Sequence, residues 1–280
     1  MAGDEAWHGK WTATALVVVL CTGISISNAL ELLLLVLVTF KKWRGLYFWS
    51  LLVTSISVLP YSVGYLAEYL SLSHLLGDIM NNIGWAVMVS GQSVVLYSRL
   101  GIILHNQKIL QAVLWMIVVN GVVFYTITTV IHYGTYTGLS TFNRGSFVIE
   151  KIQMTVYCVQ EFIISGLYVR EVWRMSRIVT LAARKKRIMW ELLVINLVII
   201  GLDIALLCLE YLNLSVIEQT FKGLAYSFKL KMELAILGKL VEIAHANSGG
   251  QADFRGNGLI DSDEHSHVHS KPDATHAITA

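Results

Sequence analysis

The sequence is short of charged residues. Asp, Glu, Lys and Arg make up only 14% of its 280 residues, whereas an ordinary soluble domain contains about 25%. The mean hydropathy is +0.60, and 55% of the residues are hydrophobic. This composition excludes an ordinary soluble enzyme and predicts an integral membrane protein. The few charges are nearly balanced, 21 basic against 19 acidic, so no nucleic-acid partner is expected.

Cysteine and several catalytic motifs are also scarce or missing. The three cysteines, Cys21, Cys158 and Cys208, lie in apolar runs and are expected to pack as small hydrophobic residues rather than form disulfides. The sequence has no Gly-rich phosphate loop, CxxC pair, GxSxG element or Asp-rich diphosphate-binding motif. The last absence argues against terpene synthases and prenyltransferases that ionise a diphosphate. Alternate histidines at 265–269 are expected to be solvated, and no metal or other cofactor is predicted.

The apolar residues form seven runs long enough to cross a bilayer, which takes about 20 residues of helix. The runs cover residues 13–40, 45–70, 79–104, 109–133, 149–172, 188–212 and 217–241. The predicted fold class is therefore all-α, a polytopic seven-transmembrane-helix bundle over residues 13–241. A lumenal segment, 1–12, precedes it. A Gly-, Ser-, Asp- and His-rich cytosolic tail, 242–280, follows it and is expected to be disordered, because it has little apolar surface to bury.

Basic residues concentrate in alternate loops and so predict the orientation of the bundle. They follow the first run, flank the end of the third, and crowd the connection between the fifth and sixth: Lys41, Lys42, Arg44, Arg99, Lys108, Arg170, Arg174, Arg177, Arg184, Lys185, Lys186 and Arg187. Since Lys and Arg are enriched in cytoplasmic loops, we expect a lumenal or external amino terminus and a cytosolic carboxyl terminus.

Polar residues recur at helix-face spacing inside the runs, and in a membrane such faces must point into the bundle. The faces comprise Ser27, Asn28 and Glu31; Thr54, Ser57, Tyr61, Tyr65 and Glu68; Asn81, Trp85, Met88, Gln92 and Arg99; Gln153, Tyr157, Gln160, Glu161 and Tyr168; Asn196, Asp203 and Glu210; and Lys222, Tyr226, Lys229 and Glu233. They predict a bundle that encloses a polar pocket.

Several of these residues are charged near the membrane midplane, where a charge costs at least about 2.5–3.5 kcal/mol, which makes each one a functional hypothesis. Because acids outnumber bases there, at least one carboxyl group is expected to stay protonated and to serve as a proton donor. The candidate acids are Glu31, Glu161, Asp203 and Glu233, and the candidate orienting groups are Gln92, Asn196 and Lys229. A structural role is equally open. Lys229 could neutralise Glu233, or Asp203 could pair with Lys229 or Lys231 and fix the helix packing.

Four stretches, residues 41–55, 84–100, 152–171 and 227–241, resemble a family of fungal seven-helix integral membrane proteins labelled as a domain of unknown function. The similarity covers residues 13–241. One branch of this family comprises the membrane-bound terpene cyclases of meroterpenoid pathways, of the ascofuranone type. The resemblance implies a multi-pass cyclase of the endoplasmic reticulum. Its partners would be membrane lipids and a lipophilic prenylated aromatic substrate.

The chemistry implied by the resemblance suits an acidic interior. An acid would protonate an epoxide, or an alcohol derived from one, on the prenyl tail, and ring closure would follow. Aromatic faces stabilise carbocations as they do other cations. The aromatic residues available for this role are Tyr61, Tyr65, Trp85, Tyr157, Phe162 and Tyr226, although each could serve ordinary helix packing instead.

Three other classes fit parts of the sequence. A receptor or sensor would share the seven spans and the basic loop, but Tyr97, Ser98 and Arg99 match the acidic-Arg-Tyr receptor motif poorly, and the last run has no NPxxY. A retinal protein could use Lys229, yet Ala225 stands where microbial pigments have an acid. A transporter would explain midplane charges, but no inverted repeat is evident.

Overall fold

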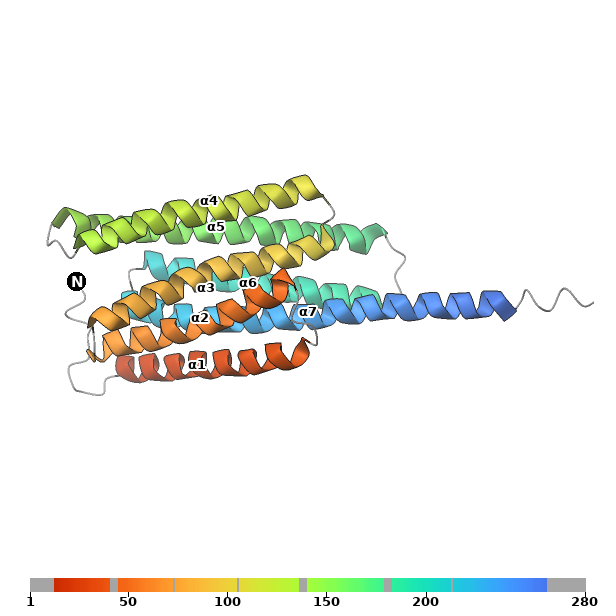
Figure 1. Cartoon of the computed structure of the whole chain (residues 1–280), viewed down its shortest axis with the longest axis horizontal. Helices are drawn as coiled ribbons and strands as arrows, with labels where there is room; N and C mark the ends of the chain where they lie inside the picture. The colour runs from red at the N-terminus through yellow and green to blue at the C-terminus, as the bar shows by residue number, and fades with distance from the viewer. Residues whose placement is uncertain are drawn as a thin grey trace, which may run out of the picture. The chain divides into compact units, whose positions relative to one another are not determined.

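The chain folds into seven helices. The computed structural model describes residues 13–40, 45–72, 74–104, 106–135, 140–178, 183–212 and 214–260. The helices are α1 (Ala13–Thr39), α2 (Leu46–Tyr69), α3 (His74–Ile103), α4 (Gln107–Thr135), α5 (Ser140–Ile178), α6 (Ala183–Tyr211) and α7 (Ser215–Ile260) (Figure 1). The all-α prediction is confirmed.

Six of the helices, α1 to α6, are long and apolar enough to cross a membrane. The chain is therefore a multi-pass helical membrane protein. The seventh expected span, 217–241, is helical as predicted but does not qualify on composition. The reason is its charge, since Glu218, Lys222, Lys229, Lys231 and Glu233 all lie in α7.

Hydrogen bonds nevertheless align α7 antiparallel to α2 over most of the length of α2. At one end, the Tyr65 hydroxyl donates to the Val216 carbonyl at 3.1 Å, and at the other the Tyr47 hydroxyl donates to the Glu233 carbonyl at 2.8 Å. The two tyrosines are 18 positions apart, which corresponds to a rise of about 27 Å in a helix, close to the thickness of a bilayer core. This part of α7 therefore extends as deep as the apolar helix beside it.

Three glycines of α3, Gly77, Gly84 and Gly91, recur every seven residues on the face that contacts α2. A Cβ atom on Gly84 would lie 2.8 Å from the Tyr61 Cα, and one on Gly77 would lie 2.9 Å from the Gly64 carbonyl oxygen. Small residues let membrane helices approach this closely. The contact holds Tyr61, Tyr65 and Trp85, on the facing turns of the two helices, near one another.

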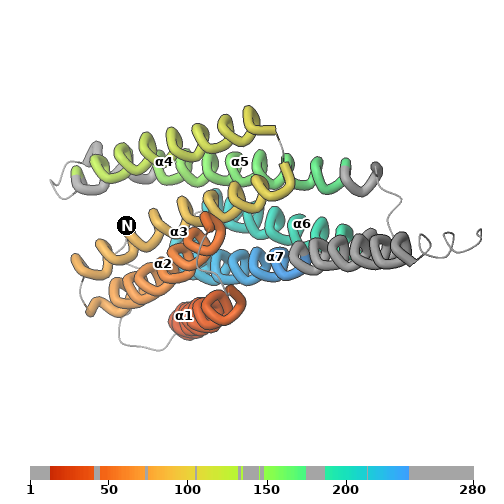
Figure 2. Tube along the Cα trace, turned by 45° about the vertical axis from the view of Figure 1, so that its right-hand side comes forward, coloured from red at the N-terminus to blue at the C-terminus, as the bar shows by residue number. Residues whose placement is uncertain are grey.

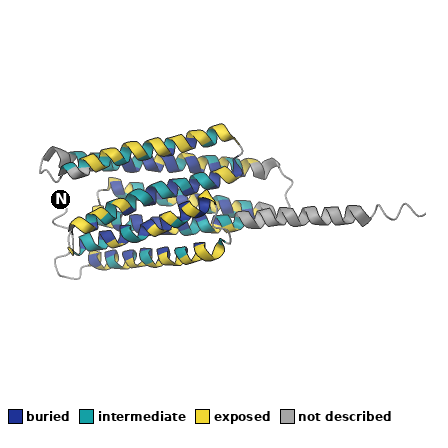
Figure 3. Ribbon diagram, viewed as in Figure 1, coloured by how far each residue is buried: buried dark blue, intermediate teal, exposed yellow. Residues whose placement is uncertain are grey.

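Polar faces point inward on most helices, as predicted. The exception is α1, where Asn28 is buried but Ser27 and Glu31 are exposed. The helix is rotated so that Asn28 donates to the Ser227 hydroxyl at 3.3 Å, which leaves Ser27 and Glu31 on the outer side. Helices α1 and α4 lie on opposite flanks of the bundle (Figures 1 and 2). Only 6% of the apolar window of α4 is buried (Figure 3), as expected for a lipid-facing helix.

The chain divides into two compact units, Met1–Leu237 and Gly238–Ala280. The first contains the bundle and ends close to the boundary expected at residue 241. In the second, the backbone of α7 continues as helix to Ile260, through the first part of the segment expected to be a disordered tail. The expected lumenal segment 1–12 and the histidines at 265–269 lie outside the described residues.

Candidate functional site

Lys229 connects three helices in the middle of the bundle. Its ammonium group is fully buried, donates to Glu161 of α5 at 3.0 Å and forms an ion pair with Asp203 of α6. It also lies 4.4 Å from the centroid of the Tyr226 ring. We call Glu161, Asp203 and Lys229 the Lys229 cluster. The structural pairing of Asp203 with Lys229 that the sequence allowed is thus present.

A second buried ion pair lies beside this cluster. The Arg99 guanidinium contacts the Glu233 carboxylate at 2.9 Å and donates to the Asn196 side-chain carbonyl at 2.7 Å. It also stacks over the Tyr168 ring, 4.1 Å from its centroid. Glu233 therefore pairs with α3, and not with Lys229 on its own helix as the sequence also allowed.

Little space remains at these central charges. The cavity beside Glu161 and Asp203 has a volume of about 10 Å³, which is at the lower limit for a single water molecule. Tyr157 and Tyr226 also line it. Gln92 is fully buried, and neither of its amide atoms has a hydrogen-bond partner among the described residues. This arrangement neutralises charge and leaves no room for a prenylated phenol.

Two other predicted residues lie apart from the central charges. Glu31 is 58% exposed on α1 and pairs with Lys231 at 2.5 Å. Phe162 is only half-buried. Neither lines this small cavity or the larger one described next.

A much larger cavity lies where α2 ends and where α3 and α7 begin. Its volume is about 280 Å³, just below the range of about 300–1,000 Å³ typical of ligand pockets. We call it the end cavity. It is lined by Tyr61, Tyr65, Glu68, Asp78, Asn81, Asn82, Trp85, Thr128, Ile149, Glu150, Gln153, Gln219 and Lys222. Three of the predicted substrate-binding aromatic residues, Tyr61, Tyr65 and Trp85, thus meet at one cavity.

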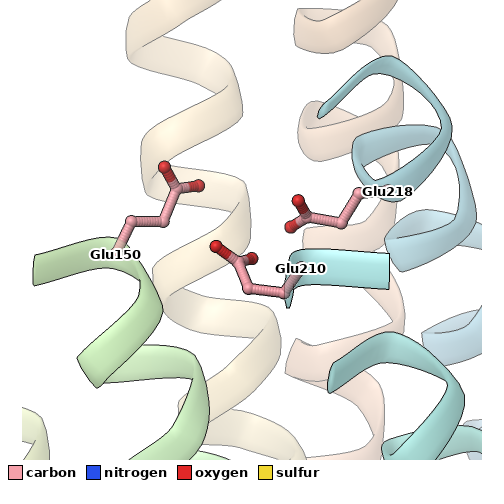
Figure 4. Close-up of side chains that lie close together, drawn as sticks. All are labelled: Glu150, Glu210 and Glu218. Atoms are coloured by element: carbon pink, nitrogen blue, oxygen red, sulfur yellow. The ribbon is translucent and has the colours of Figure 1, made fainter. Parts of the chain in front are cut away.

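Three glutamates from three helices converge behind this cavity. The carboxyl groups of Glu150 (α5), Glu210 (α6) and Glu218 (α7) point toward one another (Figure 4), and one oxygen of each lies within 4.8 Å of the others. The Lys222 ammonium pairs with Glu218 and lies 3.5 Å from Glu210 and 3.7 Å from Glu150. We call these four residues the Lys222 cluster.

The three carboxylates could serve as ligands for a metal ion, since carboxylate oxygen is the donor that hard cations prefer. However, the Lys222 ammonium already lies among them. Three carboxylates around one ammonium still carry excess negative charge, which a proton or a further cation would relieve. The chemistry available here is therefore proton donation or the binding of positive charge.

The sequence did not single out the acidic wall of the end cavity. Glu68 and Glu210 were assigned to polar faces but not to the candidate catalytic acids, and Glu150 lies next to the start of its predicted span. Helical periodicity shows which residues share a face of one helix, but not which helices come together at the same depth. A second signal was available: Glu68, Asp78, Glu150 and Glu218 all lie at or next to those ends of the predicted apolar runs that are expected to be lumenal.

No curated protein and no solved structure matches the sequence. Residues 10–257 match a domain of unknown function, DUF7703. The match covers most of the chain, including all seven helices up to the last turn of α7. The chain therefore belongs to the DUF7703 family of helical membrane proteins.

Proposed function

We propose that the protein is a membrane-bound terpene cyclase that acts in the end cavity. The observation that carries the proposal is a cavity of about 280 Å³ whose wall combines carboxyl groups with aromatic rings. The resemblance of residues 41–55, 84–100, 152–171 and 227–241 to the cyclase-containing family supports it. A prenylated phenol dissolves in the bilayer, so a multi-pass protein is a suitable catalyst for it.

Glu150 is the proposed proton donor. It lines the cavity, and its carboxyl group lies 3.7 Å from the Lys222 ammonium, in a cluster of three carboxyl groups around that one ammonium. Glu161 and Asp203 are less suited, because the cavity beside them has a volume of only about 10 Å³. Those two residues, with Arg99 and Glu233, would instead fix the packing of the bundle.

The proposed reaction is an isomerisation. The Glu150 carboxyl group gives its proton to the epoxide oxygen while one C–O bond breaks, which leaves a hydroxyl group and a tertiary carbocation. Double bonds of the prenyl tail then attack the cation, and the aromatic rings of the wall stabilise the positive charge. A carboxylate of the wall finally takes a proton from carbon, so atoms and electrons balance without an oxidant or reductant.

Microsomes that carry the full chain test this proposal. They should convert an epoxyfarnesyl phenol into a product of equal mass and different chromatographic retention. Glu150→Gln should lower turnover by about 10²–10⁴-fold, the usual contribution of a general acid. Glu31→Gln, whose side chain is exposed on α1, is the matched control and should retain full turnover.

Three outcomes would count against the proposal in different ways. Absence of turnover by the wild-type chain would overturn the cyclase and favour a receptor or sensor. Full turnover by Glu150→Gln, with loss in Glu161→Gln or Asp203→Asn, would move the acid to the Lys229 cluster. Loss in every variant without loss of folded protein would show that the acids act as one network.

A further inference from the structure

The end cavity has a surplus of negative charge around Lys222. Lys222 is the one basic residue among the described residues that line it, and its ammonium is already engaged by Glu150, Glu210 and Glu218. One ammonium cannot balance three carboxylates. The cavity therefore favours a ligand that carries positive charge.

Aromatic rings line the same space. The Lys222 ammonium lies 5.9 Å from the centroid of the Trp85 ring, within the range of a cation–π contact. Tyr61 and Tyr65 are fixed by their hydroxyl groups, which donate to the carbonyls of Gln219 at 2.8 Å and of Val216 at 3.1 Å. Carboxylates together with aromatic rings are the combination that recognises organic ammonium ions.

The wall also has hydrogen-bond donors without acceptors. Gln153 is 1% exposed, and its side-chain carbonyl accepts from the Thr128 hydroxyl at 2.6 Å, whereas its amide nitrogen has no partner among the described residues. The Trp85 indole nitrogen likewise lacks an acceptor there. A buried unpaired donor is costly. Both residues line the cavity, but the two nitrogen atoms have almost no exposed surface, so an oxygen atom on a ligand could satisfy either one only after its side chain rotates.

We propose that the end cavity binds a small organic ammonium ion that carries a hydroxyl group. The cation would lie against Trp85 and Glu150, and the hydroxyl oxygen would accept a hydrogen bond from Gln153 or Trp85. This inference goes beyond the cyclase and does not depend on it, since it requires only reversible binding to the cavity while Glu150 is ionised. In a cyclase the same ligand would imitate the positive charge of the intermediate and would inhibit.

A matched pair of probes tests the charge directly. Choline and 3,3-dimethylbutan-1-ol have the same shape, but only choline is charged. Titration calorimetry on the full-length protein in lipid nanodiscs should show saturable binding of choline and no binding of the neutral alcohol at about tenfold higher concentration. Since one cation–π contact contributes about 0.5–2 kcal/mol, Trp85→Leu should weaken choline binding by about 2–30-fold.

Two further variants connect the binding to the acidic wall. Glu150→Gln removes a carboxylate of the Lys222 cluster and should weaken choline binding at least about tenfold, the loss expected when a charge partner is removed. Glu31→Gln removes an exposed carboxylate that does not line the cavity and should bind choline as the wild type does. Thermal unfolding of each variant confirms that it is folded.

Several results would overturn the proposal. They are equal binding of the two probes, absence of choline binding up to about 10 mM, or unchanged choline binding in both Glu150→Gln and Trp85→Leu. Protection from unfolding by Mg²⁺ or Ca²⁺ but not by choline would identify the carboxylates as a metal site instead. Cyclisation is assayed separately without choline, so failure of the cyclase and failure of ammonium binding are distinguishable.

Discussion

At the scale of single residues, the buried charge of Lys229 is neutralised by residues of other helices. Its ammonium is fully buried and is shared by Glu161 and Asp203, which are 2% and 4% exposed. Removal of the lysine would leave two carboxylates in an apolar interior without a counter-charge. The cost of an uncompensated buried charge far exceeds the net value of the ion pair itself.

Lys229→Met should therefore lower the free energy of unfolding by about 3–5 kcal/mol, measured by denaturant titration of the protein in detergent micelles. Lys229→Met combined with Glu161→Gln and Asp203→Asn leaves no unpaired charge and should recover much of the loss. Arg187→Met is the control, because Arg187 is 84% exposed and pairs with Glu191 at 3.4 Å, a contact worth about 0.3–0.5 kcal/mol. A Lys229→Met protein as stable as the wild type would show that the charge is not structurally required.

The pairing at Lys229 also shows which ion pairs can be predicted from residue types alone. The sequence allowed Asp203 to pair with Lys229 or Lys231, and Asp203 does pair with Lys229. The partner of Glu233 was not predictable, because Lys229 lies one turn away on the same helix while Arg99 lies on another. Only the rotation of α3 against α7 brings the Arg99 guanidinium within 2.9 Å of Glu233.

At the scale of helices, the apolar runs predicted the elements well. The first run, 13–40, corresponds to α1 (Ala13–Thr39), and the second, 45–70, to α2 (Leu46–Tyr69). The sequence did not predict in the same way which helices pack together. Apolar residues can contact either lipid or another helix, so a run of them does not identify its neighbours. The glycines of α3 do indicate one close helix contact. The partner of that contact could not be predicted, because it is formed by Tyr61 and Gly64 of α2.

Gly84→Ala tests that contact between α2 and α3. The added Cβ atom would lie 2.5 Å from the Tyr61 backbone nitrogen, so the helices must move apart, at a cost of about 1–3 kcal/mol for such overpacking. Gly166→Ala in α5 meets no atom within 4 Å and should be neutral or stabilising by up to about 1 kcal/mol. Thermal unfolding of both variants provides the comparison, and equal stability would contradict close packing at Gly84.

At the scale of the whole bundle, α7 supplies the buried lysines that neutralise acids of other helices. Lys222 and Lys229 are seven residues apart, about 10 Å along the helix, and each neutralises acids contributed by α5 and α6. The charged side chains of α7 prevent it from qualifying as a span on composition. The same side chains form the ion pairs with the other helices. Charged residues inside a membrane protein normally face its interior in this way.

This arrangement predicts that α7 crosses the membrane despite its charge. Because Tyr65 bonds to Val216 and Tyr47 bonds to Glu233, α7 reaches the depth of both ends of α2. Seven crossings place the two ends of the chain on opposite sides, whereas six place them on the same side. With the expected lumenal amino terminus, a glycosylation-acceptor tag there should be modified in microsomes, and the same tag at the carboxyl terminus should not. Modification of both tags, or of neither, would mean that α7 does not cross, and the ion pairs of Lys222 and Lys229 would then need a different geometry in the membrane.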